Sequence, residues 1–284
     1  MFTMENCCNP SELLDLSGRK GLVVGMANAR SIAWPAALHF RKAGAELAIT
    51  HVNEATRPHV EPLARQLGAP IFMPCDVLVP GQLEAVFRTM ASRWGRLDFV
   101  LHAVGRVPPE DLRGRLTDCS AEGFSEAMLA SCHSLIRIAR LAERLMKEGG
   151  SLITLSYFGA EKVVEHYNVM GPVKAALEAS VRYLAHELGP RAIRVNAISA
   201  GPVKTRAAGG IRGFDELLAA SAARAPLRRN VEADEIGRTA LLLASDYTSA
   251  ITGEVLHVDA GFHIESPAFR DARPLDDGKQ RETR

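Results

Sequence analysis

The sequence predicts an α/β protein with one doubly wound parallel sheet of about seven strands and helices on both faces. Short, almost continuously apolar runs alternate with helical segments of ten or more residues through most of the chain. Strands buried on both faces have this composition, and the right-handedness of crossover connections makes such a sheet doubly wound. No repeat or linker divides the 284 residues, and an α/β domain of about 250 residues is ordinary.

Seven apolar runs have the length and composition of strands, and seven longer segments have helical periodicity. The strands are expected at 20–25, 46–50, 70–74, 97–103, 151–155, 193–198 and 254–258. The helices are expected at 32–43, 56–67, 83–94, 121–147, 168–188, 214–223 and 233–243. We expect an N-terminal arm at residues 1–16, the domain at residues 17–265, and a charged, mobile tail at residues 266–284.

The composition argues against several classes of partner. An apolar content of 47% supports a sizeable core, while a net charge of +1 gives no global argument for nucleic acid or an anionic membrane. No run approaches the roughly 20 apolar residues of a membrane span, and the first residues do not read as a secretory signal. The five cysteines have no paired or metal-like spacing. We therefore expect a cytoplasmic protein with reduced thiols and no metal.

Glycine or polar residues follow five of the predicted strands. In doubly wound sheets, ligands bind in the crevice at the carboxyl ends of the strands, so these residues predict one ligand site. They are Gly25, Asp76 with Val77, Val104 with Gly105, Ser156 with Tyr157, and Gly201 with Pro202.

The first of these strand ends resembles an anion site. Gly25 leads into a helix for which Ser31 is the expected N-cap, and free N–H groups at a helix N-terminus attract phosphate. The full dinucleotide fingerprint has three glycines. Because only Gly25 is present, this motif alone is weak support for a nucleotide.

Tyr167 and Lys174 are seven residues apart, nearly two helical turns, which would place them on one helix face roughly 10 Å apart. A cation near a phenol favours the phenolate, so the pair could donate a proton. Tyr157, just past the fifth strand, could bring a second hydroxyl into the same crevice. Two interfacial tyrosines and a surface lysine would give the same spacing, and spacing alone leaves both interpretations open.

Taken together, these residues resemble the short-chain dehydrogenase/reductase superfamily and, within it, the NADH-dependent enoyl-acyl-carrier-protein reductases. The resemblance runs from about Leu16 to Ile264. Most members of the superfamily carry Tyr-x-x-x-Lys, which here would need a tyrosine at Met170. The most specific matches are Leu155-Ser156-Tyr157-Phe158-Gly159-Ala160-Glu161, Tyr167-Asn168-Val169-Met170-Gly171, Arg194-Val195-Asn196-Ala197-Ile198-Ser199-Ala200-Gly201-Pro202, Gly253-Glu254-Val255 and His257-Val258-Asp259.

The resemblance implies a Rossmann-type fold and a role for each site residue. Tyr167 would stabilise negative charge on the oxygen of an enoyl thioester, Lys174 would hold the cofactor ribose, and Tyr157 would be a supporting donor. Tyr157, Tyr167 and Val107 would contact substrate, and about 203–230 would form a substrate loop. The implied cofactor-binding residues are Gly25, Ser31, Ile32, Val52, Asp76, Val77, Val104, Lys174, Val203, Lys204, Thr205, Arg206 and Ala207.

The end of the second strand favours NADH over NADPH. An enzyme that uses NADPH usually places arginine or lysine there for the 2′-phosphate. Here the first basic residue is Arg57, and Glu54 would repel a phosphate. The substrate would be a thioester of acyl carrier protein or CoA, and the family resemblance implies a homotetramer built through the helices at 121–147 and 168–188.

Several residues depart from the family pattern and keep alternatives open. Pro172 lies inside the predicted helix, where it is tolerated only near the first turn. Arg106 and Val107 stand where family members usually carry smaller or aromatic residues. Asp215 and Glu216 stand where the family tends to be basic. The alternatives are a reductase of a small enone or keto substrate, and an NADH-binding sensor without chemistry.

Overall fold

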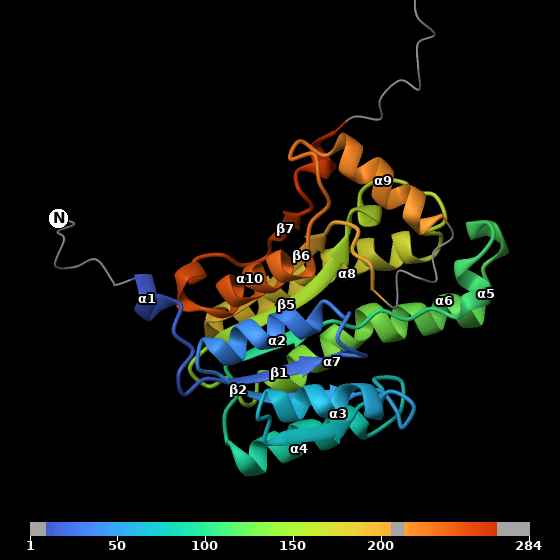
Figure 1. Cartoon of the computed structure of the whole chain (residues 1–284). Coiled ribbons are helices and arrows are strands. Elements are labelled where there is room, and N and C mark those ends of the chain that lie inside the picture. Colours follow the sequence, from blue (N-terminus) through green and yellow to red (C-terminus); the bar gives the residue numbers. More distant parts are fainter. Residues whose placement is uncertain (1–9, 206–212, 266–284) are drawn as a thin grey trace, which may run out of the picture.

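The computed structural model describes residues 10–205 and 213–265, and within them one sheet of seven parallel strands (Figure 1). The strand order is β3-β2-β1-β4-β5-β6-β7, so the order reverses between β1 and β4. The predicted fold class is therefore confirmed. The strands are β1 (Lys20–Val24), β2 (Glu46–His51), β3 (Ile71–Pro74), β4 (Phe99–His102), β5 (Gly150–Tyr157), β6 (Ile193–Ala200) and β7 (Val255–Val258).

Helices cover both faces of the sheet, because each face carries its own apolar core. Helices α2, α3 and α10 pack on one face, and α4, α7 and α8 pack on the other. Gly237 lets α10 approach α2 closely, since a Cβ there would lie 2.9 Å from the Ala36 nitrogen. The helices are α1 (Pro10–Leu13), α2 (Ala33–Lys42), α3 (Arg57–Gln66), α4 (Gln82–Arg93), α5 (Pro109–Leu112), α6 (Ala121–Met128), α7 (Ser134–Ala142), α8 (Met170–Leu188), α9 (Phe214–Arg224) and α10 (Ala233–Ala244).

The segment predicted as one helix at 121–147 is interrupted and shorter. Residues Leu129–His133 form a π-helical turn between α6 and α7. Within this turn the Ser131 hydroxyl accepts a hydrogen bond from the Arg106 N–H at 3.1 Å, which ties the helix to the loop after β4. The helix then ends at Ala142, and the chain reaches β5 through Gly149 at φ 87°.

Strands β5 and β6 extend further than predicted. They pair in parallel along their whole length, from Gly150 opposite Ile193 to Tyr157 opposite Ala200. Tyr157 is therefore the last residue of a strand rather than part of the following loop. Its backbone position is held by the ladder, which matters for a residue expected to act on a substrate.

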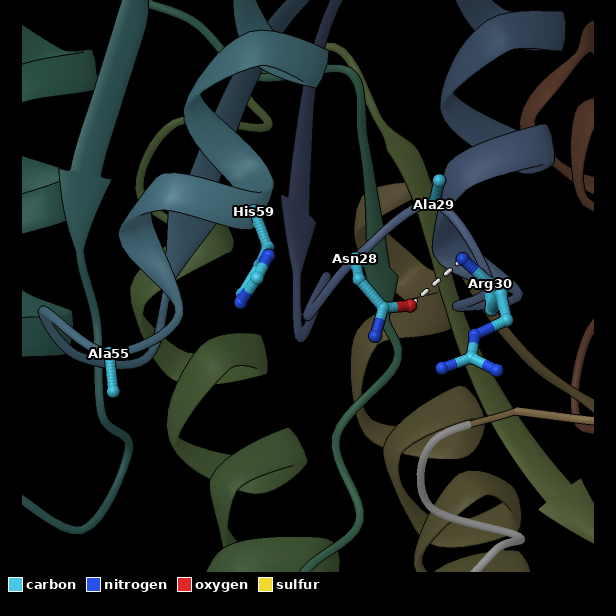
Figure 2. A pocket seen from close by; sticks show the side chains of 5 residues that line it. All are labelled: Asn28, Ala29, Arg30, Ala55 and His59. Atoms are coloured by element: carbon cyan, nitrogen blue, oxygen red, sulfur yellow. Dashed lines mark hydrogen bonds between the residues drawn. The ribbon is translucent and has the colours of Figure 1, made fainter.

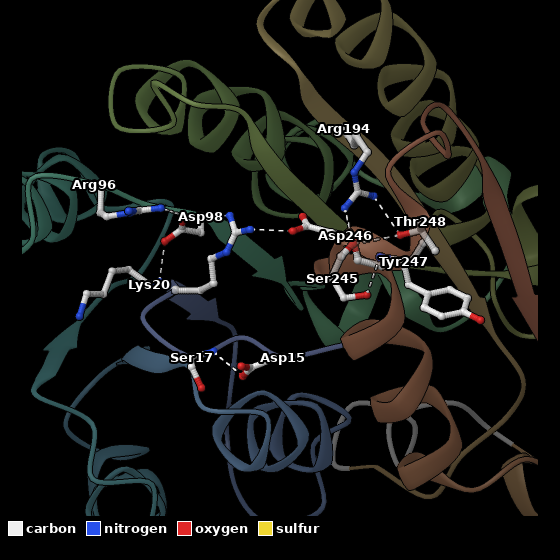
Figure 3. Close-up of polar contacts among 12 residues, drawn as sticks. Asp15, Ser17, Lys20, Arg96, Asp98, Arg194, Ser245, Asp246, Tyr247 and Thr248 are labelled. Carbon is white, nitrogen blue, oxygen red and sulfur yellow. Dashed lines mark hydrogen bonds and ion pairs between the residues drawn. The ribbon is translucent and has the colours of Figure 1, made fainter. Parts of the chain in front are cut away.

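A polar network ties the strands together at the opposite edge of the sheet (Figure 3). The Asp98 carboxylate accepts a hydrogen bond from the Lys20 N–H at 2.7 Å and also pairs with Arg96. Arg194 donates to the carbonyls of Leu243 and Ser245, joining β6 to the end of α10. These bonds hold the amino ends of β1, β4 and β6, while the carboxyl ends are left to form the crevice.

His102, the last residue of β4, is fully buried between hydroxyl groups. Its Nδ1 lies 2.8 Å from the Thr154 hydroxyl, and its Nε2 lies 2.8 Å from the Ser134 hydroxyl. Burial, followed by the positive charge of Lys174, lowers the pKa of His102 to about 3. The imidazole is therefore neutral in the native protein and can use both ring nitrogens in hydrogen bonds.

The burial of neutral His102 makes the free energy of unfolding depend on pH. The unfolded chain takes up a proton near pH 6.5 and the native His102 does not, so the free energy of unfolding should fall by about 1.4 kcal/mol per unit as pH drops below about 6.5. His102→Gln should remove that component. Chemical denaturation between pH 4.5 and 7 checks this, and parallel pH slopes for the wild-type and variant proteins would contradict it.

Candidate functional site

The site lies at the carboxyl edge of the sheet, where the strand order reverses between β1 and β4. Gly25 directly follows β1 at φ 100°, and a Cβ there would lie 2.2 Å from the carbonyl oxygen of Ala103. Only glycine fits this approach of the two strand ends. The ends of β1 and β4 therefore meet closely at this edge, and Figure 1 places α5 and α9 beyond it.

The first turn differs from the prediction in one respect, because Ser31 is not the N-cap of α2. Ile32 occupies that position without a side-chain hydrogen bond. The Ser31 hydroxyl instead accepts from the N–H groups of Ala27 and Asn28 at 3.1 and 3.2 Å. Two amides of the turn are thus used internally, and the remaining attraction for an anion comes from the helix N-terminus and the side chain of Arg30.

A hollow of about 430 Å³ opens between this turn and the start of α3 (Figure 2). Asn28, Ala29 and Arg30 line one side, and Ala55 and His59 line the other. The Asn28 carboxamide oxygen accepts from the Arg30 N–H at 2.8 Å, which holds the turn in shape. The hollow carries the Arg30 side chain on its rim and has room for part of a nucleotide, so the residues present fit part of a dinucleotide.

Asp76 and Val77 follow β3 at the same edge. The Asp76 carboxylate accepts from the Leu78 N–H at 2.9 Å and lies 3.3 Å from the Arg106 guanidinium. Arg106 also pairs with Glu126 of α6 at 2.9 Å. The guanidinium of Arg106, a residue that departs from the family pattern, is therefore held between two carboxylates.

Tyr157 and Tyr167 meet edge to face, with ring centroids 4.8 Å apart. Gly159 makes this arrangement possible, since a Cβ there would lie 2.4 Å from Cδ1 of Tyr167. Burial raises the pKa of Tyr157 to about 12 and raises the pKa of Tyr167 further, with smaller contributions at Tyr167 from Tyr157 and Glu178. Both phenols are therefore protonated near neutral pH and available as hydrogen-bond donors.

Lys174 is buried in the second turn of α8. Its ammonium donates to the carbonyl oxygen of Leu155 at 2.7 Å, two residues before Tyr157 on β5. Burial lowers the pKa of Lys174 to about 8, and the negative charge of Glu178 opposes this shift. The ammonium also faces the end of β4, because it is the nearest atom to a Cβ built on Gly105, at 3.9 Å.

The structure brings Tyr157, Tyr167 and Lys174 to the end of β5, but not along one helix face. Helix α8 begins at Met170, so Tyr167 precedes it. Asn168, at φ 41°, cannot continue a right-handed helix backwards. Pro172 then falls in the first turn of α8, where its missing N–H costs little. The predicted shared helix face is therefore wrong: Tyr167 reaches the end of β5 through its contact with Tyr157, and Lys174 reaches it through its bond to Leu155.

The other predicted site residues are distributed around the edge. Val104, Ile32 and Val203 pack as partly buried side chains against the two cores, and Val107 packs beside Tyr167. Val52 is half-buried just after β2. Lys204 pairs with Asp215 of α9 at 2.8 Å and, with Thr205, lines a second hollow of about 440 Å³. Arg206 and Ala207 lie outside the described residues.

Three residues of the site were not selected from the sequence. Glu178, on α8, hydrogen-bonds the Ser156 hydroxyl, and burial raises the pKa of this carboxyl. Its spacing of one turn from Lys174 was the available signal. Gly159 and Asn168 lie inside the motifs that carry the family resemblance. Their roles depend on the close approach of Tyr167 to Gly159 and on the positive φ of Asn168, which residue spacing does not predict.

Within residues 10–205 and 213–265, no group of three or more histidine, cysteine, aspartate or glutamate side chains is arranged to hold a metal ion. Over the same part of the chain, no helix has the length and apolar character needed to cross a membrane.

Residues 25–263 match the family model described as enoyl-(acyl carrier protein) reductase. A Rhizobium meliloti protein named enoyl-[acyl-carrier-protein] reductase [NADH] 1 is 50% identical over 90% of this chain and 94% of its own length. A FabI protein of the same description from Rickettsia felis is 45% identical over 88% of this chain and 96% of its own. The crystal structure of the Anaplasma phagocytophilum reductase in complex with NAD has a TM-score of 0.86 and 48% identity, covering 90% of this chain and 97% of that chain. This chain therefore belongs to the enoyl-[acyl-carrier-protein] reductase family.

Proposed function

We propose that the protein uses NADH to reduce the trans-2 C=C bond of an enoyl thioester, with Tyr167 as the donor to the thioester oxygen. The observation that carries this proposal is that the edge-to-face, protonated phenols of Tyr157 and Tyr167 and the buried Lys174 ammonium, bonded to the Leu155 carbonyl, all lie at the end of β5. A family whose relatives are NADH-dependent enoyl reductases supplies the reaction class.

The reaction develops negative charge on the thioester oxygen. When bound, the nicotinamide supplies a hydride to the β-carbon of the substrate. The Tyr167 hydroxyl donates a hydrogen bond to the oxygen where the charge accumulates, and a preorganised donor of this kind is typically worth about 3–4 kcal/mol of barrier. The apolar side chains around its ring, among them Val107 and Val173, exclude water from the bond. Tyr157 supports the same oxygen or orients the Tyr167 ring.

Lys174 acts through its charge and its position. Its bond to the Leu155 carbonyl leaves two of the three ammonium N–H groups for the ribose hydroxyls. A positive charge here also raises the local potential, which favours both the cofactor phosphates and the developing oxyanion. Glu178 lies one turn further along α8, and its negative charge helps to keep Lys174 protonated.

The remaining cofactor contacts follow the carboxyl edge of the sheet. Gly25, Ser31 and Ile32 would hold the pyrophosphate together with the 203–207 segment, Asp76 and Val77 would meet the adenine, and Val52 and Val104 would flank the cofactor. The choice of NADH has a physical basis in the Arg57 side chain. It lies within 3.5 Å of both Glu54 and Glu61, so its charge is already offset.

The segment of about 203–230 would serve as the substrate loop, and within it Lys204 pairs with Asp215 of α9. The acyl group would be carried by acyl carrier protein or CoA. We propose a cytoplasmic homotetramer built through α6, α7 and α8, because these helices and the π-helical turn between α6 and α7 expose large apolar side chains to solvent. Those side chains are Phe124, Leu129, Ile136 and Tyr183.

A small enone or ketone remains the second candidate substrate, favoured by the charge of Arg106 at the crevice. However, Arg106 already pairs with Asp76 and Glu126, so its positive charge attracts a polar substrate only weakly. Oxidation of NADH and of NADPH, followed at 340 nm with enoyl-CoA, enoyl-carrier, enone and ketone substrates, separates the candidates. Turnover of a ketone in preference to enoyl thioesters would favour the second, and NADH binding without turnover would indicate a sensor.

Tyr167→Phe tests the assigned chemistry directly. Removing one hydroxyl while keeping the ring should lower kcat by about 10²–10³-fold, because the donor to the oxyanion is lost. NADH affinity, measured by fluorescence titration, should change little. Turnover equal to that of the wild-type protein would remove Tyr167 from the mechanism, whatever the substrate.

NADH binding should weaken as pH rises through about 8. Lys174 is protonated below its pKa of about 8 and neutral above it, so its attraction for the cofactor is present at neutral pH and is lost in alkali. The Kd for NADH should therefore rise between pH 7 and 9.5, and Lys174→Met should bind weakly with a flat profile. A wild-type Kd that is constant over this range would show that Lys174 keeps its proton or does not bind the cofactor.

Gly159→Ala should impair catalysis by displacing the Tyr167 ring. The added Cβ would overlap Cδ1 of Tyr167, and a shift of about 1 Å at a reacting group can cost on the order of 10²-fold in rate. Gly189→Ala is the matched control, because no atom lies within 4 Å of a Cβ there. Equal kcat values for the two variants would mean that the pocket absorbs the methyl group without moving the phenol.

A further inference from the structure

The backbone on both sides of Tyr167 has an unusual conformation. His166 is at φ 64° and Asn168 is at φ 41°. L-residues other than glycine adopt this left-handed region at a cost, although asparagine tolerates it better than most. Tyr167 therefore lies between two residues of positive φ, each of which changes the direction of the chain. This backbone geometry turns its ring onto Gly159 and Tyr157.

The Asn168 side chain holds one of these reversals. Its amide nitrogen donates both of its N–H groups, one to the carbonyl of Leu112 and one to the carbonyl of Gly114, each at 2.7 Å. Because both partners are carbonyl oxygens, the opposite amide orientation would set three acceptors against each other. The orientation of Asn168 is therefore determined by chemistry, and a carboxylate at this position could not replace it.

The segment that Asn168 binds forms part of the wall around the tyrosine. Leu112 ends α5, and both Leu112 and Val107 pack in the small apolar cluster that contains Tyr167. Gly114, at φ 93°, turns the chain away immediately afterwards. The two hydrogen bonds of Asn168 thus join the loop that carries the phenol to the segment that packs against it, 54 to 56 residues away in the sequence.

We propose that Asn168 is a positioning residue that sets the Tyr167 hydroxyl, through its two bonds to the segment 112–114. The inference rests on the proposed function, because it assigns to Asn168 the control of a phenol that donates to the substrate. Loss of these bonds should free the Tyr167 loop from the apolar wall and lower kcat. It should leave NADH binding intact, since Lys174 and its bond to Leu155 belong to α8 and β5.

Two variants of Asn168 separate its side chain from its backbone conformation. Asn168→Gly keeps the left-handed conformation and removes the amide, while Asn168→Asp keeps the size and replaces two donors by acceptors. Both should lower kcat on the order of 10- to 100-fold, with the Kd for NADH within about twofold of wild type. Asn168→Asp also serves if the glycine variant fails to fold.

His166→Gly is the matched control on the other side of the tyrosine. His166 also has positive φ but is exposed, so glycine suits its backbone and no buried contact is lost. Its kcat should stay within about twofold of wild type. A fall equal to that of Asn168→Gly would mean that any glycine beside Tyr167 loosens the loop, and would overturn the assignment to the amide.

A double-mutant cycle identifies the group through which Asn168 acts. In a Tyr167→Phe background, Asn168→Gly should cost less than about twofold further, because the hydroxyl that it positions is already absent. The same factor in both backgrounds, or wild-type kcat in Asn168→Gly, would overturn the inference alone. Unchanged turnover in Tyr167→Phe would overturn the proposed function and this inference together.

Discussion

The bond from the Lys174 ammonium to the Leu155 carbonyl is the contact on which the rest of the site depends. A buried ammonium is costly unless hydrogen bonds and nearby charge replace its hydration. Here the Leu155 carbonyl supplies the hydrogen bond and Glu178 supplies the opposite charge. Because Leu155 is on β5 and Lys174 is on α8, the need to satisfy the buried ammonium fixes the position of α8 along β5. The long pairing of β5 with β6 then carries Tyr157 to the rim of the same crevice.

The sheet could be predicted because parallel strands covered on both faces must be apolar throughout, and the sequence shows this directly. The ends of the strands were harder to place. Ser156 and Tyr157 have polar groups and so resemble a loop, yet the ladder continues through them because their partners on β6 continue as well. The π-helical turn at Leu129–His133 could not be predicted either, since its apolar periodicity resembles that of an α-helix and its Ser131 hydroxyl bonds to Arg106 from another part of the chain.

The catalytic candidates show how a spacing can select the right residues for the wrong reason. The separation of seven positions between Tyr167 and Lys174 predicts one helical face, but Asn168 has a positive φ and helix α8 starts only at Met170. The contact of Tyr167 with Tyr157 comes from the loop geometry and from the space left by Gly159. Sequence periodicity reports regular structure, whereas this geometry depends on two positive φ angles and on hydrogen bonds to Leu112 and Gly114.

The same reasoning explains why the nucleotide signal in the sequence is weak while the crevice is well formed. A three-glycine fingerprint leaves backbone N–H groups free for phosphate. In this chain the Ser31 hydroxyl takes two of those groups, at Ala27 and Asn28, and holds the turn in shape without further glycines. Gly25 remains necessary because the Ala103 carbonyl occupies the place of a side chain. The turn is thus stabilised by a side chain rather than by backbone freedom, and Arg30 at its rim supplies positive charge that a glycine-rich turn would lack.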